Sequence, residues 1–224
     1  MLEPNKIVYS SRKTIAVCIT GDGDLIVRAP YGTPRFKIDD FLKKKEKWIE
    51  KHVLKRRAKK AYGMPKNSLD GYVFPLLGED CTIRVALVKR PLFEEGIRTL
   101  FIPSGDYEQS VDLVKKWLKE YARKILEEIV KIKALQMKAA VTSLSITQAK
   151  TRWGSCSGKN RLNFSFRLIF SPIAMVEYVA VHELAHVFHK DHSKAFWTKV
   201  AEFCPDYKKK RAFLKERSWY MSLF

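Results

Sequence analysis

The alternation of hydrophobic and polar positions predicts a strand-rich first half of the chain that contains one long helix. Two apolar stretches separated by the Gly-Asp-Gly-Asp run at 21–24 have the pattern of a β-hairpin. From Ile38 to about Ala61 the apolar residues recur at helical spacing, and Lys and Arg fill much of the remaining surface. The other segments with strand character lie at 6–9, 14–20, 72–77, 81–89 and 97–103.

Helical periodicity dominates the second half. A long helix is predicted from about Val111 to Ala140, and another begins at Pro172 and continues through Val-His-Glu-Leu-Ala-His-Val-Phe. We therefore expect an α+β fold with two parts: a β-rich region with a basic helix at 1–105, and a helical half with a small sheet at 106–224. Further predicted elements are strands at 143–149 and 161–169 and helices from Ser193 and from Pro205 to about Tyr220.

Composition narrows the class of protein. Hydrophobic residues make up 46% of the chain and aromatic residues 12%, which is typical of a folded domain and argues against disorder. No stretch approaches the roughly 18 uninterrupted apolar residues of a membrane span, and the first residues lack the pattern of a signal peptide. The four cysteines form no CxxC pair, so we expect free thiols. These features predict a cytoplasmic protein with no membrane partner.

The charge is strongly positive. Lys and Arg number 43 against 24 Asp and Glu, for a net charge of +19, and residues 35–60 alone contain 12 basic and 4 acidic side chains. Such a field attracts polyanions, so nucleic acid or a nucleotide is a possible partner. An ordinary solvated surface explains the same numbers equally well, because net charge determines association and not chemistry.

The residues most specific for chemistry form a His-Glu-x-x-His motif at 182–186. On a helix, His182 and His186 lie one turn apart on the same face, about 6 Å between their Cβ atoms, and both rings can reach one zinc ion. Glu183 then lies beside the remaining coordination position, where it can take a proton from a zinc-bound water. The motif is typical of zinc-dependent hydrolases, above all metallopeptidases.

Catalytic zinc usually has three protein ligands, so a third is expected downstream. His192 follows His186 by six residues, the spacing of proteases in which the chain turns back after the second histidine, and we favour it. Glu202 on the next predicted helix is an alternative. His189 would lie about 10.5 Å along a straight helix from His182, too far to share the ion unless the helix breaks there.

The second half resembles a known family. The segments Lys-Thr-Arg-Trp-Gly-Ser-Cys-Ser at 150–157, Tyr-Val-Ala-Val-His-Glu-Leu-Ala-His at 178–186 and Asp-His-Ser-Lys-Ala-Phe-Trp at 191–197 are similar to the YgjP-like metallopeptidases, relatives of the SprT-like and WLM proteases. Weaker similarities extend over nearly the whole chain. The resemblance implies a minigluzincin-like zincin core, zinc at His182, His186 and His192, Glu183 as general base, and peptide or protein substrates.

Other residues and other functions stay open at this point. Arg152 could bind a substrate carboxylate or phosphate, and Tyr178 could donate to a developing oxyanion, although packing explains Tyr178 better. A nucleophilic Cys156 is a weaker hypothesis, since the metal motif already accounts for the histidines. The alternatives to a peptidase are a metal-dependent phosphohydrolase acting on nucleotides and a nucleic-acid-associated module with structural zinc.

Overall fold

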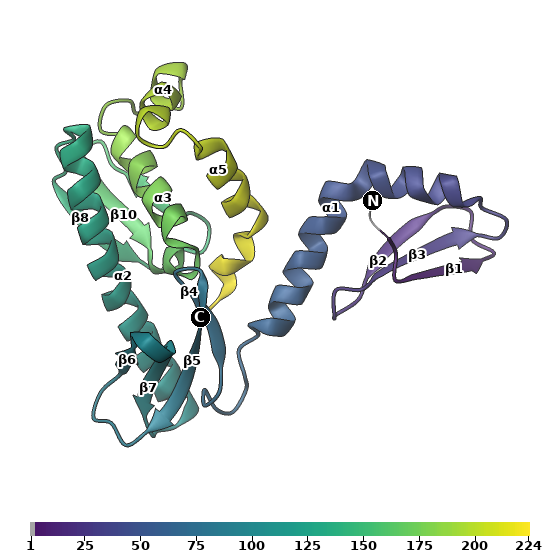
Figure 1. Ribbon diagram of the computed structural model, residues 1–224, viewed down its shortest axis with the longest axis horizontal. Helices are drawn as coiled ribbons and strands as arrows, with labels where there is room; N and C mark the ends of the chain where they lie inside the picture. The colour runs from purple at the N-terminus through teal and green to yellow at the C-terminus, as the bar shows by residue number, and fades with distance from the viewer. Residues whose placement is uncertain (1–2) are drawn as a thin grey trace. The chain divides into compact units, whose positions relative to one another are not determined.

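The structure is a computed structural model that describes residues 3–224, apart from the side chain of Lys59. It confirms the α+β class, with helices and small mixed sheets (Figure 1). The chain divides into two compact units, of which the first ends at Gly63 and the second runs from Met64 to Phe224.

A three-stranded sheet and a long helix form the first unit. The central strand β3 pairs in parallel with β1 and antiparallel with β2, and β2 and β3 form the predicted hairpin. Alternate residues of β3 pack against one face of the helix α1, so the small core contains Leu25, Val27, Ala29, Ile38, Leu42 and Ile49. The elements are β1 Lys6–Ser10, β2 Ala16–Ile19, β3 Leu25–Pro30 and α1 Arg35–Ala61.

The second unit begins with a four-stranded sheet of order β4-β5-β7-β6. Its strands are β4 Val73–Leu76, β5 Glu79–Ala86, β6 Leu92–Glu94 and β7 Thr99–Pro103. Three of them were predicted, whereas β6 is only three residues long, too short for its alternation to be distinguished from a turn.

The long helix α2, Tyr107–Met137, follows this sheet. The Asp106 side chain caps it by accepting a hydrogen bond of 2.8 Å from the Gln109 backbone N–H. One apolar face is buried at Val114, Leu118, Ala122, Leu126 and Val130. The boundary predicted between residues 105 and 106 falls inside the second unit, where α2 contacts β7. The division of the chain into parts with different roles at 1–105 and 106–224 stays a prediction.

A second small sheet has the order β8-β10-β9, so β9 forms one of its edges. The strands are β8 Ser143–Thr147, β9 Gly154–Cys156 and β10 Arg161–Ser165. The segment between the strands predicted at 143–149 and 161–169 thus contains the edge strand β9. The prediction of a strand as far as residue 169 is wrong, because Phe166–Phe170 form a 3-10 helix, η2. All five of its residues are buried, so the segment has no alternation of buried and exposed positions by which a strand could be distinguished from a helix.

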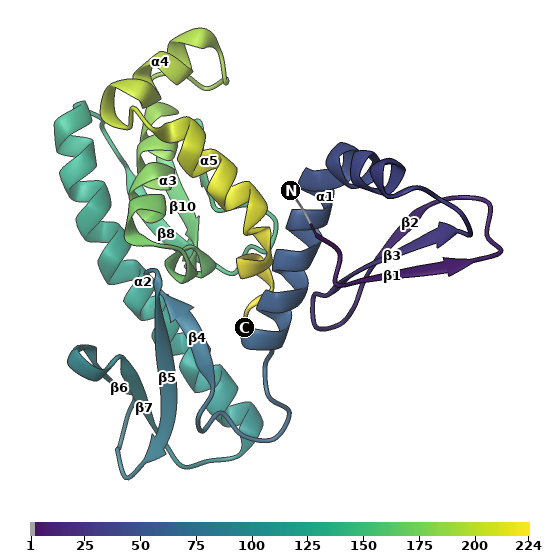
Figure 2. The ribbon, with the colours of Figure 1, turned by 45° about the vertical axis from the view of Figure 1, so that its right-hand side comes forward.

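The helix α3, Ile173–Ala185, lies between α2 and α5 and contacts β9 and α4 as well (Figures 1 and 2). The remaining elements are α4 Lys194–Phe203, α5 Tyr207–Glu216 and the 3-10 helix η3 Ser218–Ser222. Within residues 3–224 no helix has both the length and the apolar character needed to cross a membrane.

Candidate metal centre

The last turn of α3 contains His182 and Glu183 in a largely apolar helix. Eight of its thirteen residues are buried, and Glu183 is among them with 5% of its surface exposed. The helix ends at Ala185, three residues before the predicted end, and His186 is its C-terminal cap. His182 and His186 are therefore one turn apart, with ring centroids separated by 5.1 Å.

A tight turn follows and brings the chain back over the end of α3. The backbone N–H groups of Phe188 and His189 donate to the Ala185 carbonyl at 3.1 and 3.0 Å, which closes the helix. Asp191 accepts from the Ser193 backbone N–H at 3.1 Å, and the Ser193 hydroxyl accepts from the Phe196 N–H at 3.4 Å at the start of α4. His192 lies between the turn that closes α3 and the first residues of α4.

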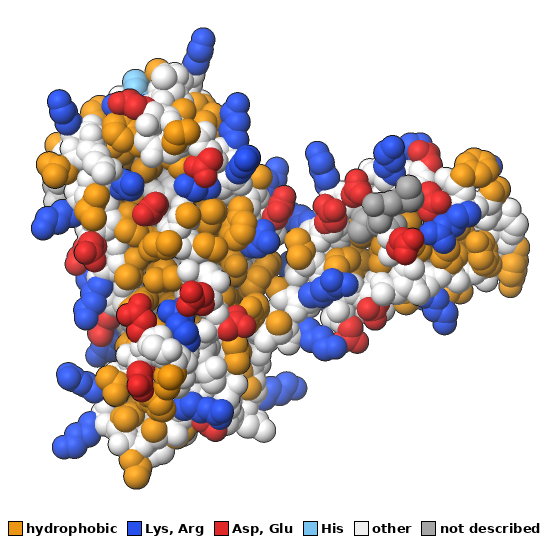
Figure 3. Space-filling view, viewed as in Figure 1, with side chains coloured by type: hydrophobic (Ala, Val, Ile, Leu, Met, Phe, Trp, Pro, Cys, Tyr) orange, Lys and Arg blue, Asp and Glu red, His pale blue; other side chains and the backbone are white. Residues whose placement is uncertain are grey.

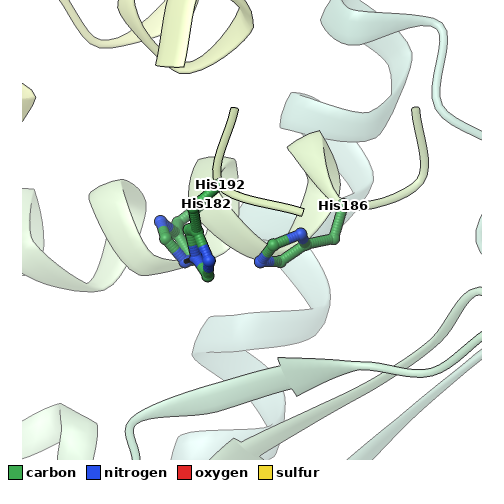
Figure 4. A group of neighbouring side chains, drawn as sticks. All are labelled: His182, His186 and His192. Carbon is green, nitrogen blue, oxygen red and sulfur yellow. Dashed lines mark hydrogen bonds between the residues drawn. The ribbon is translucent and has the colours of Figure 1, made fainter. Parts of the chain in front are cut away.

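This turn brings three imidazole rings together. One ring nitrogen from each of His182, His186 and His192 lies within 4.8 Å of the others. The His182 and His192 Nε2 atoms are 3.2 Å apart. Figure 4 shows the His186 ring directed towards the side on which the other two rings lie together.

The arrangement fits a zinc ion. Two zinc–nitrogen bonds of about 2.0–2.1 Å at a tetrahedral angle place their nitrogens roughly 3.4 Å apart, close to the 3.2 Å between His182 and His192. The Nδ1 atom of His186 lies 2.9 Å from the His189 carbonyl. That contact fixes the ring and leaves Nε2 as the free ligand atom, as a backbone carbonyl commonly does for metal-binding histidines.

An aromatic platform supports the three rings. The fully buried Phe196 has its ring centroid 4.4–4.9 Å from those of all three histidines. Trp197, the next residue of α4, lies 5.6 Å from His182 and 5.7 Å from His192. Because both aromatic residues belong to the helix that Ser193 begins, the position of the rings depends on the turn before α4.

Burial determines the ionisation of the site. Loss of solvent lowers the pKa of His182 to about 3, and the nearby His186, His192 and Arg211 lower it further. Burial also lowers the pKa of His186. Both rings are therefore neutral at pH 7 and have lone pairs for a metal. Burial raises the pKa of Glu183 to about 8, against the opposing charge of Arg152.

Gly154 of β9 lies directly against Glu183. A Cβ atom at this position would come within 2.7 Å of the Glu183 Oε1 atom and 2.8 Å of its Cγ atom. Real Cβ atoms do not approach other atoms so closely, so any residue with a side chain would displace the carboxylate. The glycine in Trp-Gly-Ser-Cys thus allows the edge strand to contact the catalytic candidate, a role that its sequence position alone did not reveal.

The structure does not bring the alternative third ligands to the cluster. Glu202 is exposed and forms an ion pair with Lys199 at 3.1 Å. His189 contributes its backbone carbonyl to His186, while its side chain lines a separate cavity together with Glu202. Among the described residues, the side chains that lie close enough together to hold a metal ion are those of His182, His186 and His192.

Cys156 and Tyr178, two further candidates from the sequence, have the surroundings of residues that serve in packing. Burial raises the pKa of the Cys156 thiol, against the opposing charge of Lys190, so it stays protonated at neutral pH and is a poor nucleophile. Tyr178 is 5% exposed and contacts the His182 ring with its own at 6.1 Å. Burial raises its pKa to about 12, so the phenol keeps its proton.

A cavity beside the histidines contains two residues that sequence reasoning missed, Arg211 and Lys215 of α5, together with the predicted Arg152. No local pattern distinguishes Arg211 and Lys215 from the other basic residues of that helix, because only the packing of α5 against α3 brings them to the site.

Comparison with known families agrees with this geometry. The model of the YgjP-like metallopeptidase domain matches residues 13–217, and the chain therefore belongs to this family. Membership implies a metal-dependent hydrolase that acts on peptides or proteins. A comparison with curated proteins finds no match.

Proposed function

We propose that this member of the YgjP-like family is a zinc-dependent peptidase in which His182, His186 and His192 hold the metal and Glu183 is the general base. The observation that supports it most is the convergence of three imidazole rings, with ring nitrogens within 4.8 Å of one another, next to a carboxyl group buried in a largely apolar helix. Buried ionisable groups are costly, so such a cluster indicates a functional site.

Each residue of the site has a separate role in the proposed reaction. A zinc ion held by the three histidines would supply Lewis acidity and acidify a coordinated water. In its ionised form, which the positive charge of a bound zinc ion would favour, Glu183 accepts the proton of the attacking water and later delivers it to the leaving amine. Gly154 keeps the adjacent strand clear of this carboxylate, and Phe196 keeps the three rings in place.

The structure favours a catalytic over a structural metal. Structural zinc sites have four protein ligands, whereas a catalytic site keeps one position open. In the part of the chain that the structure describes, the cluster has three members, one of which, His192, is exposed. The nucleic-acid module with structural zinc has no comparable support, since among the described residues the cluster offers three ligands and not four. On the face that Figure 3 shows, Lys and Arg side chains lie among acidic ones.

A substrate screen distinguishes the peptidase from the metal-dependent phosphohydrolase. Purified, zinc-loaded protein is incubated with casein and, separately, with nucleoside triphosphates, with Glu183→Gln as the matched control. We expect casein cleavage by the wild type, none by the variant, and no release of phosphate. Phosphate release that depends on Glu183, without casein cleavage, would instead establish the phosphohydrolase.

A further inference from the structure

A cavity of about 380 Å³ opens beside His182 and Glu183. Three parts of the second unit form it: α3, the segment that leads into β9, and α5. Its lining residues are Arg152, Trp153, Gly154, Tyr178, Val179, His182, Glu183, Arg211, Leu214 and Lys215. Because the cavity reaches the catalytic candidates, whatever it binds lies next to the scissile bond.

The charge of this cavity is one-sided. Arg152, Arg211 and Lys215 line it, and the acidic residue among the lining side chains is the buried Glu183, which the reaction needs. Among residues 3–224, none of the three cations forms an ion pair with a carboxylate within 4.0 Å. Elsewhere on the same helix, Lys210 pairs with Asp206 at 3.0 Å. Arg211 and Lys215 thus lack the ion pair that Lys210 has on the same helix.

The Arg211 guanidinium lies over an aromatic ring. Its guanidinium carbon lies 5.0 Å from the centre of the Trp197 ring, which itself stacks on Tyr207 at 5.0 Å and 15°. Trp197 also contacts His182 and His192, so the guanidinium is fixed relative to the metal site. A stacked guanidinium keeps its in-plane N–H groups available for a carboxylate.

Lys215 is one helical turn beyond Arg211 and therefore on the same face of α5. Leu214, which is 4% exposed, and the 4% exposed Val179 of α3 form apolar walls beside these charges, with Trp153 as a third wall. A cavity with apolar walls and a cationic side suits a short aliphatic stem that ends in a negative charge.

We propose that this cavity is a substrate subsite for a peptide carboxylate, with Arg211 as its main specificity determinant and Lys215 and Arg152 in support. The carboxylate has two chemical sources, an acidic side chain near the scissile bond or the free C-terminus of the peptide. This inference rests on the proposed peptidase function and names its substrate class.

The first test is a cleavage profile. A peptide library from digested denatured proteins is treated with the zinc-loaded wild type, Arg211→Gln and Glu183→Gln, and new termini are identified by mass spectrometry. We expect Asp or Glu to be enriched within about two positions of the cleaved bond, or cleavage to cluster at free C-termini and to stop on amidation. Arg211→Gln should lose that preference. A profile indifferent to both features, or unchanged by Arg211→Gln, overturns the proposal.

The second test measures binding without hydrolysis. The inactive Glu183→Gln protein is titrated calorimetrically with acetyl-Ala-Leu-Ala-Glu-Ala-Leu-amide, with its Gln counterpart, and with the Gln peptide bearing a free C-terminus. One of the two carboxylate peptides should bind at least about tenfold more tightly than the neutral peptide, as expected for a charge-assisted hydrogen bond. Adding Arg211→Gln should remove the difference.

Lys209→Gln is the matched control, because it removes the same charge from α5 two residues away, about 200° around the helix, and lies outside the cavity. It should leave the difference intact. Equal binding of all three peptides, or equal losses in Lys209→Gln and Arg211→Gln, overturns the subsite. Arg211-dependent binding by a protein that cleaves nothing would retain the subsite and remove the peptidase function.

Discussion

The two helices α1 and α3 place polar residues in opposite environments. On α1 the many Lys and Arg side chains are solvated, and the helix contributes Ile38, Leu42 and Ile49 to a small core. On α3 most side chains are buried, and His182 and Glu183 interrupt an apolar surface. A charge in water costs little free energy, whereas one in a core costs much, so the polar residues of α3 are the informative ones.

Burial alone does not identify function, as Arg167 of η2 shows. It is 2% exposed, yet its guanidinium donates to the backbone oxygens of Leu223 and Gln148, both at 2.9 Å, and to that of Phe224. His182 differs, because its Nδ1 atom is buried without a hydrogen-bond partner among the described residues. A satisfied buried group stabilises the fold, whereas an unsatisfied one needs another reason to be present.

The largest expected effect separates His192 from its neighbour His189. Replacing His192 by Ala should lower zinc affinity at least about 100-fold, because a three-ligand site loses one ligand. Because His192 is exposed, its replacement removes little buried surface and leaves the fold in place. His189→Ala keeps the backbone carbonyl that holds His186 and should bind zinc normally. Zinc titration against a chelating dye measures both, and a loss in Glu202→Ala with tight binding in His192→Ala would contradict the assignment.

Gly154 tests the contact between β9 and α3. Gly154→Ala should lower kcat about 10- to 100-fold while zinc content stays near that of the wild type, because the new methyl group displaces the Glu183 carboxylate. Gly158→Ala, in the same segment, adds a methyl group with no atom within 4 Å and serves as the control. Equal activity of the two variants would show that the position of Glu183 is not limiting.

Arg167→Met should affect stability and not chemistry. Removing a buried guanidinium leaves its backbone acceptors unsatisfied, so the free energy of unfolding should fall by about 3 kcal/mol. Urea unfolding of the metal-free protein measures this, with the exposed Arg161→Met of β10 as control. Zinc stoichiometry should be unchanged in both. A loss of zinc without a loss of stability would place Arg167 in the site and break the distinction from His182.

The smallest effect is expected on α1. Replacing the exposed Lys43, Lys47 and Lys51 by Gln should change peptide hydrolysis by no more than about twofold, since solvated charges contribute little. The same samples are titrated with duplex DNA at low and high salt. Salt-sensitive binding by the wild type that the triple variant loses would show that the surface of α1 is functional.

Much of this arrangement could be predicted from the sequence. Helical spacing placed His182 and His186 on one face with Glu183 beside them, and the Ser193 cap predicted the helix after the turn. The preference for His192 over Glu202 and His189 depended on the resemblance as well as on spacing, because His189 occupies the position where a turn through glycine is usual.

The remaining features depend on packing between distant segments. The contact of Gly154 with Glu183 and the approach of Arg211 to His182 join residues about 30 positions apart. No local periodicity contains that information. The end of α3 at Ala185 was missed for a related reason, since the apolar Val187 and Phe188 follow the second histidine while the backbone turns.

The most direct test compares zinc content and peptide hydrolysis in the same preparations of wild type and Glu183→Gln. The account predicts one zinc per chain in both proteins, casein cleavage by the wild type, and a loss of at least about 100-fold in the variant, because Glu183 moves protons and does not hold the metal. Undiminished cleavage by Glu183→Gln would contradict the central claim.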